Sequence, residues 1–196
     1  NFTARRPELL MEGDKPVITG YAAVFYSATD RGTEYQLMPG FIERVMPGAF
    51  ARAMADADDC RALFNHDASR VLGRTTSKTL RLSVDAVGLR YEIDPPNTAT
   101  GAEVLELLRR GDLDGSSYSF DLQPSDCQMV KQGDTWVRNI HTITRLYDVG
   151  PVTFPAFTAT TAQARAADHQ RAITLAEQAA LVAARARARA LTLMGM

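Results

Sequence analysis

Three stretches of this chain carry side chains that could act together in hydrolysis. In "RALFNHDASRVLGRT", His66 is one of only three histidines and follows an apolar triplet. "DGSSYSFD" contains Ser116, Ser117 and Ser119, and "RLYDVGPVTFPA" contains Asp148. A hydroxyl nucleophile needs a base within hydrogen-bond reach and a third group that orients that base. A serine and a histidine from two different strands would supply the first two parts of such a site.

Taken alone, these residues do not identify an enzyme. A serine that begins a strand after Asp114 and Gly115 is usual in turn chemistry, where its hydroxyl bonds to the local backbone. The chain has no Gly-x-Ser-x-Gly elbow and no phosphate-binding loop of the Walker type. The nucleophile assignment therefore needs further evidence.

Composition excludes several classes of protein. The 196 residues are 45% hydrophobic and 23% charged, which is typical of a globular domain. The net charge of −1 gives no sign of the overall positive charge that nucleic-acid-binding proteins use to bind phosphates. Cys60 and Cys127 fit neither a disulfide framework nor a zinc site, so we expect a reducing compartment and neither metal nor cofactor. No apolar run approaches the roughly 20 residues that span a bilayer, and the first residues lack a signal-peptide pattern. We therefore expect neither membrane insertion nor export.

The apolar pattern predicts an α+β architecture. Residues 17–157 contain short alternating runs rich in Val, Ile, Tyr, Phe and Thr, which predict a mostly antiparallel β core. In "TATGAEVLELLRRGDLDG" the apolar spacing changes to that of a helix that ends at Gly111. "PGAFARAMADADD" predicts a second helix. These helices would pack around the β core.

Composition changes sharply near the C-terminal end. Ala, Arg, Gln and Leu dominate residues 158–196, which have no proline and no glycine before Gly195, so we expect one long helix there. This divides the chain into a domain of residues 1–157 and a helical tail of residues 158–196. Arginines at 185, 187 and 189 spread around such a helix and form no dedicated basic face.

The ordered motifs resemble those of the tailed-bacteriophage prohead maturation proteases. They are "PGFIERVMPGAFARAM", "ALFNHDASRVLGRT", "LRLSVDAVGLRYEIDPPNTATGAEVLELLRRGDLDGSSYSF" and "RLYDVGPVTFPAF", and together they span about residues 17–162. Each piece is weak, but the ordered set is specific. This family is related in fold to the herpesvirus assemblins, whose catalytic histidine also lies in an Asn-His-Asp context followed by a Val-Gly or Leu-Gly pair.

The resemblance implies a serine endopeptidase on a closed or nearly closed β-barrel surrounded by helices. Its substrates would be scaffold and major capsid protein segments, and often the protease itself, inside the assembling prohead in the host cytoplasm. It implies no nucleic-acid or membrane partner and leaves a homo-oligomer open. The Ala/Arg tail would be shed or rearranged on activation.

The resemblance also assigns the site. His66 matches the family's base and Ser117 its nucleophile, because a serine, an aromatic or aliphatic residue, a small residue and Phe occur in that order. Ser119 stands where many members carry Gly, which leaves Ser116 and Ser119 as alternatives. The oxyanion donors would come from the Gly150 loop, although Pro151 has no N–H to offer.

The group that orients His66 is left open by the sequence. Assemblins use a second histidine here, and many phage members carry Glu near the position of Thr142. His141 lies one residue earlier, so it could take the role only through a β-bulge, because a one-residue shift moves a side chain to the other face. We place His141 ahead of Asp148, and a missing or purely structural third group is the remaining option. Thr142 and the tail also support an alternative function, a catalytically impaired assembly module that docks on the capsid shell.

Overall fold

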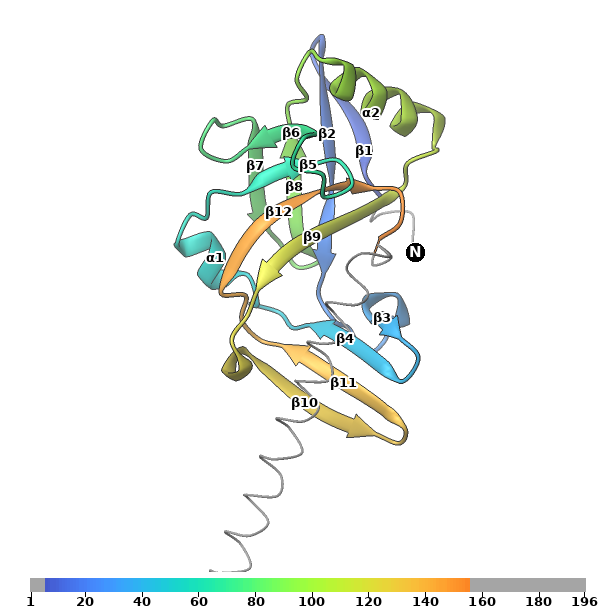
Figure 1. Cartoon of the computed structure of the whole chain (residues 1–196), viewed down its shortest axis with the longest axis vertical. Helices are drawn as coiled ribbons and strands as arrows, with labels where there is room; N and C mark the ends of the chain where they lie inside the picture. Colours follow the sequence, from blue (N-terminus) through green and yellow to red (C-terminus); the bar gives the residue numbers. More distant parts are fainter. Residues whose placement is uncertain (1–5, 156–196) are drawn as a thin grey trace, which may run out of the picture. The chain divides into compact units, whose positions relative to one another are not determined.

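The computed structural model describes residues 6–155, which form three four-stranded β-sheets and two α-helices (Figure 1). The sheet orders are β1-β2-β8-β7, β10-β11-β4-β3 and β6-β5-β12-β9. The strands are β1 (Glu8–Glu12), β2 (Lys15–Val24), β3 (Tyr35–Met38), β4 (Phe41–Val45), β5 (Arg61–Leu63), β6 (Val71–Arg74), β7 (Leu80–Val84), β8 (Gly88–Ile93), β9 (Gly115–Asp121), β10 (Cys127–Gln132), β11 (Thr135–Ile140) and β12 (Arg145–Val152). The helices are α1 (Ala51–Ala55) and α2 (Ala99–Arg110), and 3-10 turns cover Arg31–Thr33 and Pro124–Asp126.

The predicted α+β barrel surrounded by helices is wrong. Within residues 6–155 the strands form three separate open sheets, none of which closes on itself, and only two helices accompany them. Two of the strand pairs, β11 with β4 and β12 with β5, are parallel. Alternating hydrophobicity locates strands but carries no information about which edges pair, so the pattern could not distinguish a barrel from open sheets. The predicted long helix over residues 158–196 lies outside the described residues.

A single apolar core joins the three sheets. Ile18 from β2, Val45 from β4 and Val149 from β12 are each fully buried in it. The Phe50 ring packs edge-on against the Tyr118 ring of β9, with their centroids 5.7 Å apart. Burying a side chain of this size stabilises a fold by about 2–3 kcal/mol. The core therefore fixes the positions of β9 and β12.

Helix α2 follows its sequence signals. Thr98 caps its first turn, with the side chain accepting a hydrogen bond from the Gly101 N–H. Val104 is fully buried, and Gly111 ends the helix in the left-handed conformation with φ of 77°, as the sequence predicts. Helix α1 is shorter than predicted: it ends at Ala55, and Ala57 has a positive φ of 50°.

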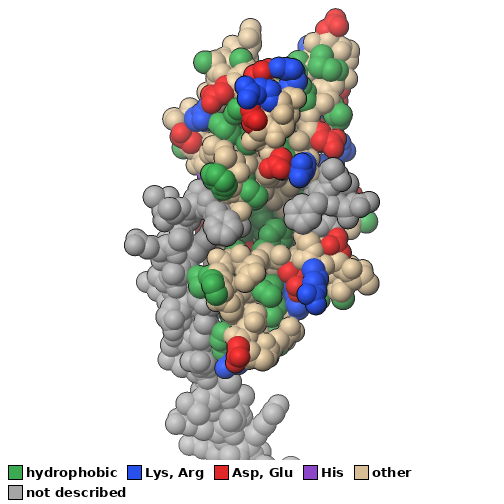
Figure 2. Space-filling view, turned by 90° about the vertical axis from the view of Figure 1, so that its right-hand side faces the viewer, with side chains coloured by type: hydrophobic (Ala, Val, Ile, Leu, Met, Phe, Trp, Pro, Cys, Tyr) green, Lys and Arg blue, Asp and Glu red, His purple; other side chains and the backbone are tan. Residues whose placement is uncertain are grey.

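The charged surface is mixed. On the face shown in Figure 2, basic and acidic side chains lie next to one another instead of gathering into patches of one sign. Typical pairs are Arg81 with Asp94 and Arg74 with Asp59. Among residues 6–155, no helix has the length and apolar character needed to cross a membrane.

Candidate active site

His66 lies in a tight loop directly after β5. The loop is closed by backbone hydrogen bonds from the Phe64 N–H to the Arg70 carbonyl and from the Arg70 N–H to the Asp67 carbonyl. Asp67 turns its side chain to Ser69, whose hydroxyl and N–H both donate to it and lower the pKa of that carboxyl. The Asp67 carboxylate therefore stabilises the turn, whereas the His66 side chain reaches β12.

The structure brings Asp148 to His66. Asp148 Oδ1 lies 2.5 Å from His66 Nδ1, and Asp148 is only 7% exposed. The two residues are 82 positions apart in sequence and meet because β12 pairs in parallel with β5, with Asp148 opposite Arg61. A buried carboxylate is costly unless it is hydrogen-bonded, so the contact stabilises the carboxylate and orients the imidazole at once.

A β-bulge in β12 turns Asp148 toward the site. The register against β9 shifts between Leu146, which is opposite Phe120, and Asp148, which is opposite Ser119. Without the extra residue, Leu146 and Asp148 would share a face. With it, Leu146 enters the core and Asp148 faces His66.

The three serines of β9 divide between its two faces. Ser116 Oγ lies 2.8 Å from the hydroxyl of Tyr91, which is fully buried in the core. Ser117 and Ser119 alternate with it and therefore face the opposite side. Ser119 Oγ is 3.2 Å from His66 Nδ1, and Ser117 is opposite Gly150 on β12.

The geometry determines which nitrogen of His66 is free to accept a proton. An ionised carboxylate only accepts hydrogen bonds, so the close contact with Asp148 requires the proton of the neutral ring to be on Nδ1. The acceptor lone pair of the neutral ring is then on Nε2. A hydroxyl that His66 deprotonates must approach Nε2, whereas Ser119 lies beside Nδ1.

His141 and Gly150 are placed differently from the expectation. His141 follows the end of β11 with an exposed side chain, and its backbone N–H donates to the Asp126 carbonyl. No contact between the side chains of His141 and His66 occurs in the described structure. Gly150 lies inside β12, paired with Ser117, and is not part of a loop.

Two residues near His66 were not singled out by the sequence analysis. They are Asn65, which directly precedes His66, and Thr153, which follows the end of β12 and is bound by the Asn65 side chain. Asparagine is the common non-glycine residue in left-handed backbone, so its place before His66 was the available signal. Thr153 carries no comparable signal.

Cys60 lies in the buried layer beside the site. The thiol is fully buried, and burial together with the negative charge of Asp148 raises the pKa of Cys60 to about 12. The thiolate is the reactive form of cysteine, so this thiol is inert at neutral pH. Across residues 6–155, no three His, Cys, Asp or Glu side chains group as metal ligands do.

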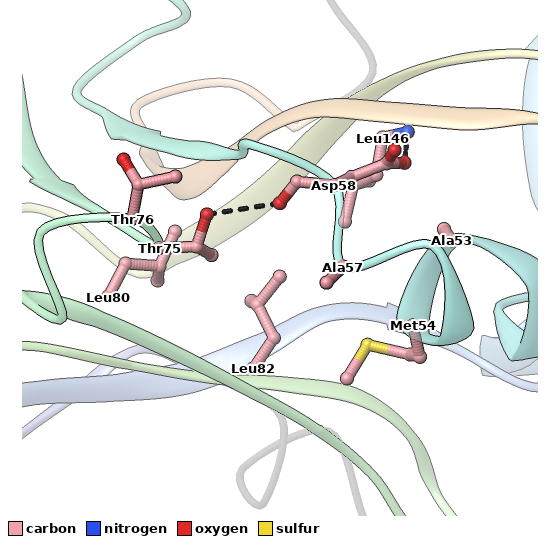
Figure 3. A pocket seen from close by; sticks show the side chains of 9 residues that line it. All are labelled: Ala53, Met54, Ala57, Asp58, Thr75, Thr76, Leu80, Leu82 and Leu146. Atoms are coloured by element: carbon pink, nitrogen blue, oxygen red, sulfur yellow. Dashed lines mark hydrogen bonds between the residues drawn. The ribbon is translucent and has the colours of Figure 1, made fainter.

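A separate apolar pocket of about 370 Å³ lies on the other side of β12 (Figure 3). Its β12 residue is Leu146, which the bulge directs away from the face that carries Asp148. Figure 3 shows the Thr75 hydroxyl on the pocket wall, donating to the Asp58 carbonyl. The pocket and the His66 site are thus on opposite faces of one strand. The lining residues are Ala53, Met54, Ala57, Asp58, Thr75, Thr76, Leu80, Leu82 and Leu146.

The family of the chain follows from comparison with known proteins. No curated protein and no solved structure matches the chain. A sequence profile described as caudovirus prohead serine protease matches residues 2–173, which is most of the chain. The chain therefore belongs to the caudovirus prohead serine protease family and has that family's protease role in capsid maturation.

Proposed function

We propose that this protein is a serine endopeptidase in which Ser117 is the nucleophile, His66 the general base and Asp148 the group that orients His66. The observation that carries the proposal is the 2.5 Å contact between His66 Nδ1 and Asp148 Oδ1, on the sheet face that also bears Ser117. Family membership supplies the reaction class. The strand register supports the assignment of each residue.

The reaction would follow the general chemistry of acyl transfer. Ser117 Oγ attacks the scissile carbonyl carbon while His66 Nε2 takes the hydroxyl proton. The imidazolium that forms is stabilised by the Asp148 carboxylate at Nδ1. Collapse of the tetrahedral intermediate expels the amine, which receives the proton from Nε2. Water activated by the same nitrogen then hydrolyses the acyl-enzyme and restores Ser117.

Two arguments favour Ser117 over its neighbours. The Ser116 hydroxyl is bonded to Tyr91 on the core face of β9 and points away from the imidazole. Ser119 contacts Nδ1, the nitrogen whose proton is directed to Asp148, so that nitrogen is unable to deprotonate it. Ser119 instead acts as a second polar neighbour of Nδ1.

The orienting role goes to Asp148 in this proposal. His141 was the first choice from the sequence, but its side chain is exposed and the described structure joins His66 to Asp148. The orienting group needs a direct hydrogen bond to the base, and Asp148 has one.

The proposed substrates are segments of the scaffold and the major capsid protein, and the protease chain itself. Family membership places the protease in the assembling capsid within the host cell and implies capsid-related substrates in general. Self-cleavage would separate the proposed domain of residues 1–157 from the tail of residues 158–196. Both the named substrates and the self-cleavage extend the family assignment.

Co-expression with the phage's own capsid and scaffold precursors tests the proposal. The wild-type chain should give discrete fragments, and Ser117→Ala or His66→Ala should each reduce kcat/KM by about 10³-fold or more. Asp148→Asn should cost about 10²–10⁴-fold, because the amide favours the wrong tautomer of His66. Ser119→Ala should cost less than about 10-fold, because it removes only a secondary contact to Nδ1.

Ser116→Ala is the matched control on the same strand, and its activity per folded molecule should equal that of the wild type. A serine-directed phosphonate followed by peptide mapping should place the adduct on Ser117. An adduct on Ser119 would reassign the nucleophile. Intact precursor bound to the shell in all samples, wild type included, would instead establish the impaired assembly module.

A further inference from the structure

We infer that Asn65 is a positioning residue that holds His66 against Asp148. It does so through two hydrogen bonds between its side chain and Thr153, which we call the clamp. This inference rests on the proposed function, because it assigns Asn65 a role for the same imidazole. Asn65 does not face the reacting atoms. Its N–H binds Pro151 in β12, and its side chain binds Thr153, which follows this strand.

The hydrogen bonds extend the β5–β12 pairing beyond the ends of both strands. The regular parallel register covers Arg61 and Ala62, opposite Asp148 and Val149. Past β5, the Asn65 N–H donates to the Pro151 carbonyl, at 3.1 Å. The side-chain amide of Asn65 then acts as a peptide group would: Oδ1 accepts from the Thr153 N–H at 2.8 Å, and Nδ2 donates to Thr153 Oγ1 at 3.3 Å.

The backbone at this point is one that most residues avoid. Asn65 and His66 are consecutive non-glycine residues in left-handed conformation, with φ of 56° and 57°. Such a pair persists only where the surroundings hold it, and asparagine tolerates the conformation better than other residues with a side chain. The clamp is the feature that holds it here, since it ties the first of the two residues to Thr153.

The direction of the His66 ring depends on this backbone. The conformation turns the chain back after β5, so that the ring reaches Asp148 on the neighbouring strand. Within residues 6–155, two side chains tie the 64–67 segment to β12 and its extension: His66 through Asp148, and Asn65 through Thr153. If the side-chain hydrogen bonds of Asn65 are lost, the contact with Asp148 and the backbone bond from the Asn65 N–H to the Pro151 carbonyl must hold the strained loop. The imidazole then spends less time in the reactive orientation.

The test compares substitutions that separate the backbone from the side chain. Asn65→Gly keeps the left-handed conformation but removes both side-chain hydrogen bonds. Thr153→Val removes the hydroxyl with nearly the same shape, and Thr153→Ser keeps the hydroxyl as the matched control. The substrate is a peptide that spans a cleavage site mapped with the wild-type protein, and each full-length variant is checked for folding by circular dichroism.

Asn65→Gly should lower kcat about 10- to 100-fold with KM unchanged within about twofold, since a positioning residue acts on the reaction step and not on ground-state binding. Thr153→Val should give a smaller loss in kcat, and Thr153→Ser should stay within about twofold of the wild type. The reaction rate with a serine-directed phosphonate should fall in parallel with kcat.

Proton NMR supplies a readout that is independent of proteolysis. The downfield Nδ1 proton of His66 should be sharp in the wild type and in Thr153→Ser, and broadened or lost in Asn65→Gly. Wild-type kcat together with an unchanged Nδ1 signal in folded Asn65→Gly would overturn the inference. If the wild type cleaves nothing, the proposed function fails, and the Nδ1 signal still decides whether Asn65 positions His66.

Discussion

Tyr91 and Ser116 form a polar pair at the back of the strand that carries the candidate nucleophile. Their oxygens are 2.8 Å apart, and burial raises the pKa of Tyr91 well above its ordinary value, so the phenol stays protonated. A hydrogen bond of this kind is costly to break on one side only, because the remaining group stays desolvated.

Tyr91→Phe should therefore lower the free energy of unfolding by about 1–2 kcal/mol, as measured by urea denaturation. Ser116→Ala should cost a similar amount, and the double variant should cost less than the sum of the two. Tyr147→Phe is the control, because its hydroxyl donates to Asp121 at the exposed surface. If variants at Tyr91, Ser116 and Tyr147 all lost the same free energy of unfolding, and the losses at Tyr91 and Ser116 were additive, a coupled buried pair would be contradicted.

The candidate site could be predicted from the sequence only in part. The motif order proposed His66 as the base and Ser117 as the nucleophile, because such motifs depend on local residue order. It did not distinguish His141 from Asp148, because that choice depends on the β-bulge before Asp148 and on which strands lie side by side. Asn65 was missed because its partner Thr153 is 88 positions away.

Strand β12 approaches β5 so closely at Gly150 that only glycine fits. A Cβ there would lie 2.3 Å from the Leu63 carbonyl oxygen, and the Gly150 φ is +153°. Gly133, in the turn between β10 and β11, has a positive φ of 59° but open space around it. Alanine substitutions at the two positions therefore distinguish the cost of steric crowding, at Gly150, from the cost of a positive φ alone, at Gly133.

Gly150→Ala should destabilise the fold by more than about 3 kcal/mol, since the backbone of β5 has to move. Gly133→Ala should cost only about 1 kcal/mol, which is the ordinary cost of left-handed alanine. Thermal denaturation of the two variants gives the comparison. A Gly150→Ala protein as stable as Gly133→Ala would show that the close approach is absent in solution.

The prediction of individual elements was better than that of their assembly. Helix α2 ends at Gly111 because its stop signal is local. The sheets depend on pairings such as β11 with β4, whose residues lie far apart along the chain. Strand patterns report burial and not partners, which is why a closed barrel was expected and three open sheets were found.

The fold as a unit should lose stability in acid. Hydrogen bonds from Thr144 and from the Gln123 N–H lower the pKa of Asp126, and hydrogen bonds from Tyr21 and from backbone N–H groups lower that of Asp85. Since the folded pKa is depressed, the unfolded chain binds more protons as pH falls. This stability is therefore complete above the ordinary carboxyl pKa of about 4 and is lost below it.

Asp126→Asn should be less stable than the wild type at neutral pH, and the difference should shrink as the pH falls to about 3. Urea unfolding at a series of pH values measures it. Asp14→Asn is the control, because it removes an exposed carboxyl that accepts no hydrogen bond within residues 6–155. A constant gap between Asp126→Asn and the wild type across the series would contradict the linkage.

The position of β12 also has a consequence for timing. It is the last strand of the described chain, yet it lies in the middle of its sheet, between β5 and β9 (Figure 1). While the chain is being synthesised, His66 and Ser117 leave the ribosome before the strand that joins them exists. The sheet is complete only when β12 pairs with β5 and β9, so a nascent or truncated chain that ends before Asp148 carries the proposed base and nucleophile without the strand that lies between theirs. Under the proposed assignment, proteolysis would therefore begin only after β12 has been synthesised.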